Sequence, residues 1–236
     1  MCTVTVIPLA GGGLRLVSNR DEQRTRKPAG APIEHELSGG RVGIWPVDPD
    51  AGGTWIGAAD GLVLTLLNGN PAPAPDLSGV VGLRSRGMLI PELIGSVDAE
   101  SAVGALEEMD LSVFAPFRLV LVDAPGGSAR VIDARWDRKT LHATRHGDPV
   151  VCFASSGLGD SKVQIRLPLF EELVAPSPTV EAQDAFHRHI WAERPELSVL
   201  MTRSDARTVS ITSVELRPGS GASMSHESVE EPARAR

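Results

Sequence analysis

The first residue of this chain able to do nucleophilic chemistry is Cys2, which directly follows the initiator methionine. A cysteine attacks a carbonyl carbon as its thiolate, and its free pKa of about 8.5 means that a base must take the proton. Initiator methionine is generally removed before a small residue, and removal would leave Cys2 with a free α-amine of pKa about 7.7–8. That amine can accept the thiol proton, so the sequence predicts a terminal nucleophile. The alternative is that Cys2 is merely the second residue of an edge strand.

A hairpin is predicted over residues 3–17, where two apolar, β-branched segments flank a run of three glycines at 11–13. A two-residue or four-residue turn places Cys2 opposite Asp21, whereas a three-residue turn places it opposite Glu22. In either register the hairpin returns a polar segment to the side of Cys2.

That polar segment is the run Asn-Arg-Asp-Glu at 19–22, which supplies one amide and three charges after an apolar strand. An aspartate beside Cys2 would orient the terminal ammonium group. Arg20 would favour the thiolate and bind an anionic substrate group. The alternative is an ordinary loop in which Arg20 and Asp21 are solvated.

Three further polar segments follow or enter predicted strands, and each has a purely structural alternative as a turn. Asn68 could donate its side-chain N–H to an oxyanion, or could form a tight turn with the glycine that follows it. The hydroxyls of Ser155 and Ser156 could bind a ligand or cap a turn. The glycines before Thr54 and Trp55 could allow a ligand close to the backbone, or could simply form a turn.

The remaining reactive residue types show no pattern of a metal or cofactor site. Cys152 lies in an apolar segment at 150–154 and is expected in the core. His187 and His189 are two residues apart on a predicted helix, so they point to different faces, and no His or Cys spacing fits zinc. No glycine-rich nucleotide motif and no G-x-S-x-G motif occurs. No cofactor is therefore expected.

These residues must be positioned by the fold, which composition and pattern predict to be a single α+β domain over residues 1–216. The 236 residues are 42% hydrophobic, and antiparallel sheets with helices packed outside are expected. The predicted strands, besides the hairpin, are 41–45, 53–58, 61–67, 117–123, 129–136, 149–154, 198–202 and 207–216. The predicted helices are 86–93, 98–109, 162–174 and 180–191. Residues 217–236 are rich in Ser, Gly, Glu, Arg and Pro and are expected to be a disordered tail.

Charge and hydropathy exclude several classes of partner. The formal net charge of −7 argues against nucleic acid, whose phosphates attract clustered Lys and Arg. No run of 18 apolar residues is present, so no membrane span is expected. The first residues lack the basic and long apolar regions of a secretory signal, so we expect a cytoplasmic protein. A small-molecule ligand is the expected partner, and a homo-oligomer is possible.

Several of these segments together resemble the NRDE family, which is also called the Transport and Golgi Organisation 2 family. The match is specific over about the first 90 residues and looser near Ser155-Ser156-Gly157-Leu158 and Ala206-Arg207-Thr208-Val209-Ser210. The specific segments, in chain order, are Met1-Cys2-Thr3, Ser18-Asn19-Arg20-Asp21-Glu22, Gly52-Gly53-Thr54-Trp55-Ile56-Gly57, Leu67-Asn68 and Ser85-Arg86-Gly87.

The family is similar to N-terminal-nucleophile hydrolases of the bile-salt hydrolase and penicillin acylase type. That resemblance implies a four-layer αββα sandwich with Cys2 as nucleophile, its own amine as base, Asp21 as the carboxylate that holds the amine, and Asn68 as an oxyanion donor. The chain departs from the bile-salt hydrolase pattern at Ser18, where that pattern has Arg, and at Ser155-Ser156, where those enzymes and many NRDE members have Asn. The implied substrate-binding residues are Asn19, Arg20, Thr54, Trp55, Arg86, Ser155, Ser156 and Arg207.

Three functions follow as hypotheses. The first is a cysteine amidohydrolase or acyltransferase that cleaves an amide, ester or thioester of a small molecule through an acyl-Cys2 intermediate. The second is a non-catalytic carrier of heme or a lipid anion, since some family members are linked to heme trafficking, with Cys2 or a histidine as ligand and Arg20 paired to a propionate. The third is a plain interaction domain.

Overall fold

The computed structural model describes residues 2–71 and 73–230, which form twelve strands and four α-helices. The strands of the first sheet are β1 (Cys2–Pro8), β2 (Leu14–Gln23), β10 (Val151–Ser155), β11 (Ala206–Arg217) and β12 (Gly221–Ser228). The strands of the second sheet are β3 (Ile33–Glu36), β4 (Val42–Trp45), β5 (Ile56–Ala59), β6 (Leu62–Asn68), β7 (Phe117–Asp123), β8 (Arg130–Trp136) and β9 (Leu141–His146). The helices are α1 (Leu89–Leu93), α2 (Ala99–Glu108), α3 (Arg166–Leu173) and α4 (Val180–His187).

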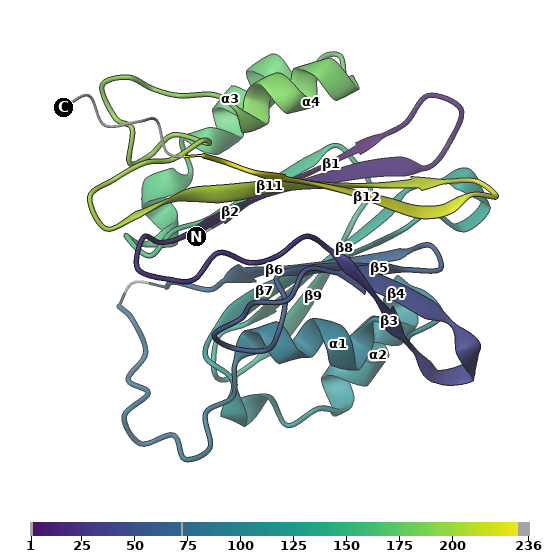
Figure 1. Ribbon diagram of the computed structural model, residues 1–236, viewed down its shortest axis with the longest axis horizontal. Coiled ribbons are helices and arrows are strands. Elements are labelled where there is room, and N and C mark those ends of the chain that lie inside the picture. The colour runs from purple at the N-terminus through teal and green to yellow at the C-terminus, as the bar shows by residue number, and fades with distance from the viewer. Residues whose placement is uncertain (1, 72, 231–236) are drawn as a thin grey trace.

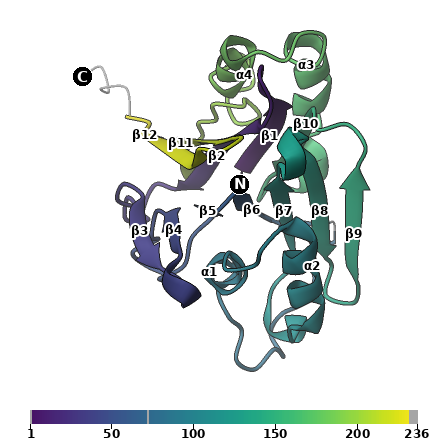
Figure 2. The same cartoon turned by 90° about the vertical axis from the view of Figure 1, so that its right-hand side faces the viewer.

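The two antiparallel sheets lie face to face, and a pair of helices covers the outer face of each (Figure 1). The five-stranded sheet has the order β10-β1-β2-β11-β12 and lies under α3 and α4. The seven-stranded sheet runs from β3 to β9 in sequence order and lies over α1 and α2, as the second view also shows (Figure 2). The predicted four-layer sandwich is therefore confirmed.

Strand β1 is buried on both faces, because one face packs against the other sheet and the opposite face packs against the helices. In β1, Val4 and Val6 point into the space between the sheets, whereas Thr3 and Thr5 point towards the helices. All four are fully buried. A strand covered on both sides has no solvent face, so its sequence lacks a strict apolar and polar alternation.

Local signals in the sequence fix the helix starts. The carboxylate of Asp98 accepts the backbone N–H of Ser101 at 2.8 Å and caps α2. The hydroxyl of Thr179 accepts the backbone N–H of Ala182 at 3.2 Å and caps α4. These bonds satisfy donors that the first helical turn leaves free. All four predicted helices are present, with shorter ends than predicted.

The predicted register of the first hairpin is wrong by one residue. Cys2 pairs with Arg20 rather than with Asp21 or Glu22. The loop is centred on Gly11 and closes with the backbone N–H of Leu9 on the carbonyl of Gly13 at 3.2 Å. All three glycines have positive φ, which allows the loop to close in this register.

Three strands arise where the sequence predicted none, and one predicted strand is absent. Strands β3 and β9 and the edge strand β12 were missed, while residues 198–202 contain only an isolated bridge at Thr202. Strand β12 lies within the segment 217–236 that was predicted to be disordered, and it pairs with β11 over eight positions. Its side chains are exposed or half-buried, so no apolar pattern marks it. Residues 231–236 of that segment lie outside the described residues.

No helix in the described part of the chain combines the length and the apolar character that crossing a lipid bilayer requires.

Three apolar clusters fill the spaces between the four layers. The cluster between the two sheets includes Cys2. Packing of this sheet-to-sheet space therefore controls the surroundings of the predicted nucleophile.

Gly13→Ala should destabilise the protein much more than Gly11→Ala. Both glycines have a φ near +87°, so both alanines carry a similar backbone penalty of about 1–2 kcal/mol. A Cβ at Gly13 would also lie 2.0 Å from the carbonyl oxygen of Leu216, whereas one at Gly11 meets nothing within 4 Å. We expect Gly13→Ala to lower the free energy of unfolding by about 2 kcal/mol more, measured by urea denaturation. Equal losses would contradict this close approach of the loop to β11.

Candidate active site

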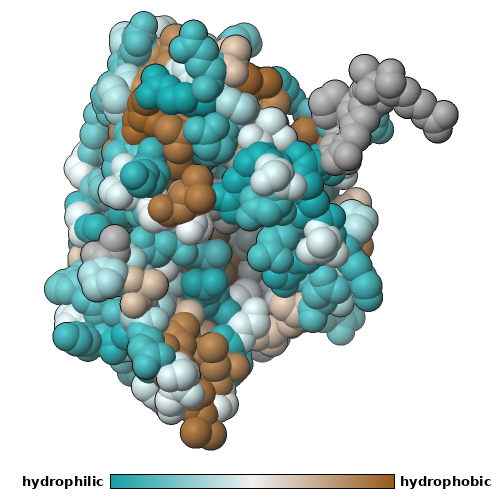
Figure 3. All heavy atoms as spheres, turned by 90° about the vertical axis from the view of Figure 1, so that its left-hand side faces the viewer, coloured by the Kyte–Doolittle hydropathy of each residue, from teal (hydrophilic) through white to brown (hydrophobic). Residues whose placement is uncertain are grey.

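Four strand ends meet at one end of the sandwich and bring the predicted catalytic residues together. Cys2 begins β1, Asp21 lies near the end of β2, Asn68 ends β6 and Ser155 ends β10. The face of the molecule in Figure 3 is hollowed between the two halves of the sandwich, and hydrophilic residues gather around the hollow. A cavity of about 320 Å³ at this end is lined by the predicted residues Cys2, Arg20, Asp21, Thr54, Trp55, Asn68 and Arg86. We call it the nucleophile cavity.

Cys2 is held between two neighbouring strands and is almost completely buried. It pairs with Arg20 of β2 on one side and with Ser155 of β10 on the other. Burial raises the pKa of the Cys2 thiol, and the charge of Asp21 raises it further. The backbone N–H of Asp21 and the charge of Arg20 lower this pKa, but burial outweighs them. The thiol is therefore neutral at physiological pH and needs a base before it can attack.

Arg20 forms a rigid wall of the nucleophile cavity. Its guanidinium group lies 4.3 Å from the centre of the Trp55 ring, in a cation–π contact. It also donates to Asp48 at 2.6 Å and to Glu22 at 3.2 Å. These contacts fix the guanidinium group beside Cys2.

Asp21 lies on the opposite face of β2 from Arg20, in a pocket of polar groups. Its carboxylate accepts a hydrogen bond from the hydroxyl of Thr208 at 2.5 Å and lies 3.8 Å from the guanidinium group of Arg166. Arg166 donates in turn to the hydroxyl of Thr3 at 2.6 Å. Burial raises the pKa of Asp21, while Arg166 and Thr208 lower it. The carboxylate is thus held beside the start of β1 by fixed partners.

Sequence reasoning missed Arg166, although its side chain is fully buried at the first turn of α3. It lies 163 positions from Thr3 in the chain, so no local spacing connects them. An arginine at the start of a predicted apolar helix was the only signal available.

Thr54 and Arg86 belong to a wall where two backbone segments touch. The backbone N–H of Thr54 donates to the carbonyl of Gly87 at 2.9 Å, and a Cβ on Gly53 would lie 2.5 Å from Gly87. The conspicuous glycine before Thr54 therefore serves backbone packing. Arg86 donates to the carbonyl of Pro116 at 2.8 Å. Burial lowers the pKa of Arg86, and the proximity of Cys2 raises it.

Three hydrogen-bond donors around Cys2 have no protein partner among the described residues. The Oγ of Ser155 and the Nε1 of Trp55 are buried without any hydrogen bond. No hydrogen bond joins the side-chain amide of Asn68 to another described residue, although its backbone carbonyl accepts one. Donors preorganised in this way can stabilise the negative oxygen of a tetrahedral intermediate.

Four predicted substrate-binding residues do not line the nucleophile cavity, and one of them, Ser155, still lies opposite Cys2 on β10. Asn19 points towards the helices, where its amide donates to the backbone carbonyl of His187 at 2.9 Å. Ser156 accepts the backbone N–H of Leu158 at 3.1 Å in a turn. Arg207 donates to backbone carbonyls and borders a separate cavity. Side chains alternate between the two faces of a strand, so Asn19 faces the helices while Arg20 faces the other sheet.

The described residues contain no group of three or more His, Cys, Asp or Glu side chains that could hold a metal ion. Cys152 packs against the apolar cluster under α3 and α4, as expected from the sequence. Burial raises the pKa of its thiol. Cys152 is therefore a poor nucleophile in the folded protein.

Comparisons with known proteins identify the family and the fold. A family model described as Transport and Golgi organisation 2 matches residues 1–206. No curated protein matches the sequence. Among solved structures, a Caenorhabditis elegans N-acylethanolamine-hydrolyzing acid amidase ortholog is similar with a TM-score of 0.60 and 14% identity, over 90% of this chain and 92% of the other. Penicillin V acylase from Agrobacterium tumefaciens is similar with a TM-score of 0.51 and 13% identity, over 91% of this chain and 80% of the other. The fold is therefore that of the N-terminal-nucleophile hydrolases.

Two hydroxyls near the site should differ sharply in their effect on stability. Thr208 both donates to Asp21 and accepts the backbone N–H of Met201 at 2.9 Å, whereas the hydroxyl of Ser155 is buried without a partner. We expect Thr208→Val to lower the free energy of unfolding by about 2 kcal/mol and Ser155→Ala to leave it within about 0.5 kcal/mol. Chemical denaturation at pH 7 measures both. A large loss in Ser155→Ala would mean that its hydroxyl has a structural partner.

Proposed function

This chain belongs to the Transport and Golgi organisation 2 family, and we propose that it is a cysteine hydrolase or acyltransferase acting on a small-molecule amide, ester or thioester. The observation that carries the proposal is the position of Cys2. It begins a central strand between Arg20 and Ser155, with unpartnered donors beside it. A hydrolase-like function also fits the fold shared with an amidase and an acylase.

The proposed reaction begins with removal of Met1, which gives Cys2 a free α-amine. That amine takes the thiol proton as the sulfur attacks the substrate carbonyl carbon, and a C–S bond forms. The carbonyl oxygen becomes an oxyanion that accepts hydrogen bonds from Asn68 and Ser155. The C–N, C–O or C–S bond of the substrate then breaks, and the ammonium group returns its proton to the leaving amine, alcohol or thiol. Water or an amine then attacks the acyl carbonyl and gives its proton to the α-amine. The C–S bond breaks, and the proton returns to the sulfur of Cys2.

Asp21 is a positioning residue in this proposal. Its carboxylate is fixed by Thr208 and Arg166 near the start of β1, where an ammonium group on Cys2 would lie. A negative charge there favours the protonated amine and so stabilises the state formed after the thiol loses its proton. The neutral thiol of the resting protein makes such a base necessary.

A carrier of heme or a lipid anion is the competing proposal for the same cavity. The described residues that line the nucleophile cavity include no histidine to serve as an axial ligand beside Cys2. Arg20, which would pair with a propionate, is already paired with Asp48 and Glu22. These two observations favour the enzyme. A heme titration that gives no saturable Soret shift would agree with them.

The pH dependence of Cys2 alkylation tests the role of the terminal amine. The processed protein should lack Met1 by intact mass and react with iodoacetamide at neutral pH, with a rate that rises near the amine pKa of about 8. A matched variant with several residues added before Cys2 cannot free that amine. Burial raises the pKa of its thiol, so it should react appreciably only at pH above 9. Retention of Met1 in the native protein, or identical pH profiles, would contradict the proposal.

Removing an oxyanion donor should slow catalysis without unfolding the protein. We expect Ser155→Ala and Asn68→Ala each to lower kcat for an activated aryl ester about 100-fold, provided that Cys2→Ala abolishes the reaction. Ser18→Ala is the matched control, because the Ser18 hydroxyl is also buried and unpartnered but lies opposite Val4, deeper in the sheet. It should retain the native rate. Equal losses in all three variants would indicate a general packing effect.

A further inference from the structure

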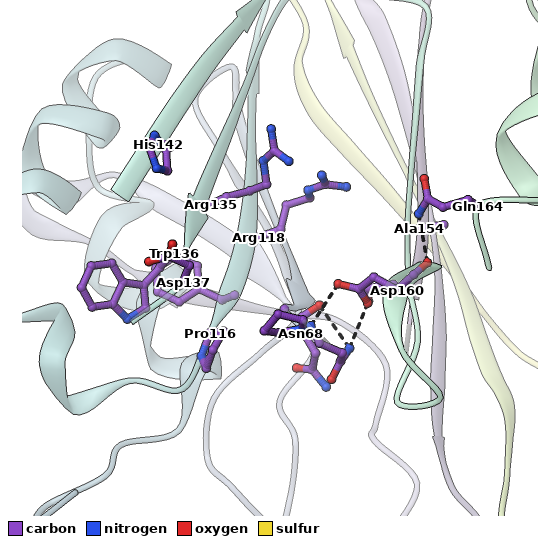
Figure 4. A pocket seen from close by; sticks show the side chains of 15 residues that line it. Asn68, Pro116, Arg118, Arg135, Trp136, Asp137, His142, Ala154, Asp160 and Gln164 are labelled. Carbon is purple, nitrogen blue, oxygen red and sulfur yellow. Dashed lines mark hydrogen bonds between the residues drawn. The ribbon is translucent and has the colours of Figure 1, made fainter. Parts of the chain in front are cut away.

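A second cavity, of about 500 Å³, is drawn in Figure 4 and shares a lining residue with the nucleophile cavity. Asn68 lines both cavities, and Ser155, the cross-strand neighbour of Cys2, lines the second one. A substrate whose carbonyl lies at Cys2 would therefore extend directly into this space. We call it the arginine cavity, after Arg118 and Arg135 in its lining.

A row of three basic side chains crosses one wall of the arginine cavity. Arg118 of β7 pairs with Arg135 of β8, and Arg135 pairs with His142 of β9. Directly opposed residues of antiparallel strands share one face of the sheet, so the three side chains are neighbours. Figure 4 shows Arg118 and Arg135 extending side by side from adjacent strands, above Asn68. Two opposed arginines repel each other, so their juxtaposition needs a compensating charge.

A single buried carboxylate supplies that charge and fixes the orientation of both arginines. The two oxygens of Asp133 lie 3.1 Å from Nε of Arg118 and 3.3 Å from Nε of Arg135. No hydrogen bond joins the terminal Nη atoms of either arginine to another described residue. Each guanidinium group is therefore ion-paired through its inner nitrogen, and that of Arg118 also lies 5.1 Å from the centre of the Phe153 ring, while the outer nitrogens remain available to a ligand. Burial lowers the pKa of Arg118, the charges of Asp133 and Asp160 raise it, and the charge of Arg135 lowers it, with burial dominant.

The two other carboxylates at the cavity wall are already occupied by backbone donors. Asp160 accepts the N–H of Asn70 at 3.0 Å and that of Ser156 at 2.9 Å. Asp137 accepts two backbone N–H groups of its own turn at 2.8 Å. The rest of the wall is largely apolar and includes Pro71, Pro116, Phe117 and Trp136.

We infer that the arginine cavity binds a carboxylate that the substrate carries at the end remote from its scissile bond, joined by a short apolar spacer. This inference rests on the proposed function, because it places the scissile carbonyl at Cys2. A carboxylate matches the fork of an arginine with two parallel hydrogen bonds, and the apolar wall suits the spacer. The substrate class is thus an amide or ester of an ω-carboxylated acid.

A matched pair of esters tests this class. The substrates are the aryl monoester of adipic acid and the aryl ester of hexanoic acid, which differ only in the terminal carboxylate. Wild-type protein should prefer the adipate ester in kcat/KM by at least tenfold, and Arg135→Gln should remove that preference. Arg135 is half-exposed, so this variant should fold. The control is Arg145→Gln, an exposed arginine of β9 that pairs with Glu100 outside the cavity, and it should keep the preference.

Each outcome separates the inference from the proposed function. Equal kcat/KM for the two esters in wild-type protein, or the same preference in Arg135→Gln, overturns the carboxylate site while leaving the cysteine hydrolase intact. If Cys2→Ala cleaves both esters as fast as wild type, the proposed function fails. Calorimetric titration with adipate and with hexanamide then tests the carboxylate site independently of catalysis. Binding of adipate that is lost in Arg135→Gln supports it, and equal or absent binding of both overturns it.

Discussion

The pairing of β1 on both of its edges is the constraint on which the rest of the site depends. Because β1 lies between β2 and β10, Cys2 has a fixed neighbour on each side, Arg20 and Ser155. Side chains alternate between the faces of a strand, so a slip of one residue would turn Cys2 from the sheet-to-sheet space towards the helices. The loop centred on Gly11 closes the hairpin in one register, and the packing of Gly13 against β11 holds it there.

The same alternation divides the chemistry between the two faces of the five-stranded sheet. Cys2 and Arg20 face the other sheet, whereas Asp21 faces α3. The helix side carries a buried polar network instead of a large apolar core. His187 shares hydrogen bonds of 2.7 Å with both Thr5 and Asn19. Burial holds the pKa of His187 well below its ordinary value, so the network contains a neutral imidazole. Buried hydrogen-bond networks of this kind hold a layer in one position, which in the proposed hydrolase would keep the Asp21 carboxylate beside Cys2.

The sequence predicted the four-layer fold and seven of the residues that line the nucleophile cavity, but not the details that depend on register. Helix α2 could be predicted from its N-cap residue Asp98, because a capping signal lies within a few residues of the helix it starts. Strand β12 was missed because an edge strand with exposed side chains has no apolar pattern. Asn19 was wrongly placed among the residues of the ligand site, because the sequence does not show which face of β2 its side chain occupies without the hairpin register. Arg118 and Arg135 went unnoticed, since nothing in the sequence shows that they oppose each other across β7 and β8.

The two cavities beside Cys2 differ in how their arginines are used, and this difference assigns them different roles. In the nucleophile cavity, Arg20 donates to two carboxylates and stacks on Trp55, so it shapes the wall and the local field rather than waiting for a ligand. In the arginine cavity, the paired arginines contact Asp133 through their inner nitrogens and Arg118 also lies over the Phe153 ring, but no hydrogen bond among the described residues uses their outer nitrogens. Rigidity around the sulfur favours reaction at one carbonyl orientation, because a misplaced carbonyl loses the oxyanion donors. In the proposed hydrolase, selection among substrates would then fall to the neighbouring cavity, where the outer nitrogens of the arginines make no hydrogen bond to described residues and the walls fit an apolar spacer. Asn68 lies on the boundary, so a change there would alter both the chemistry and the fit of the substrate.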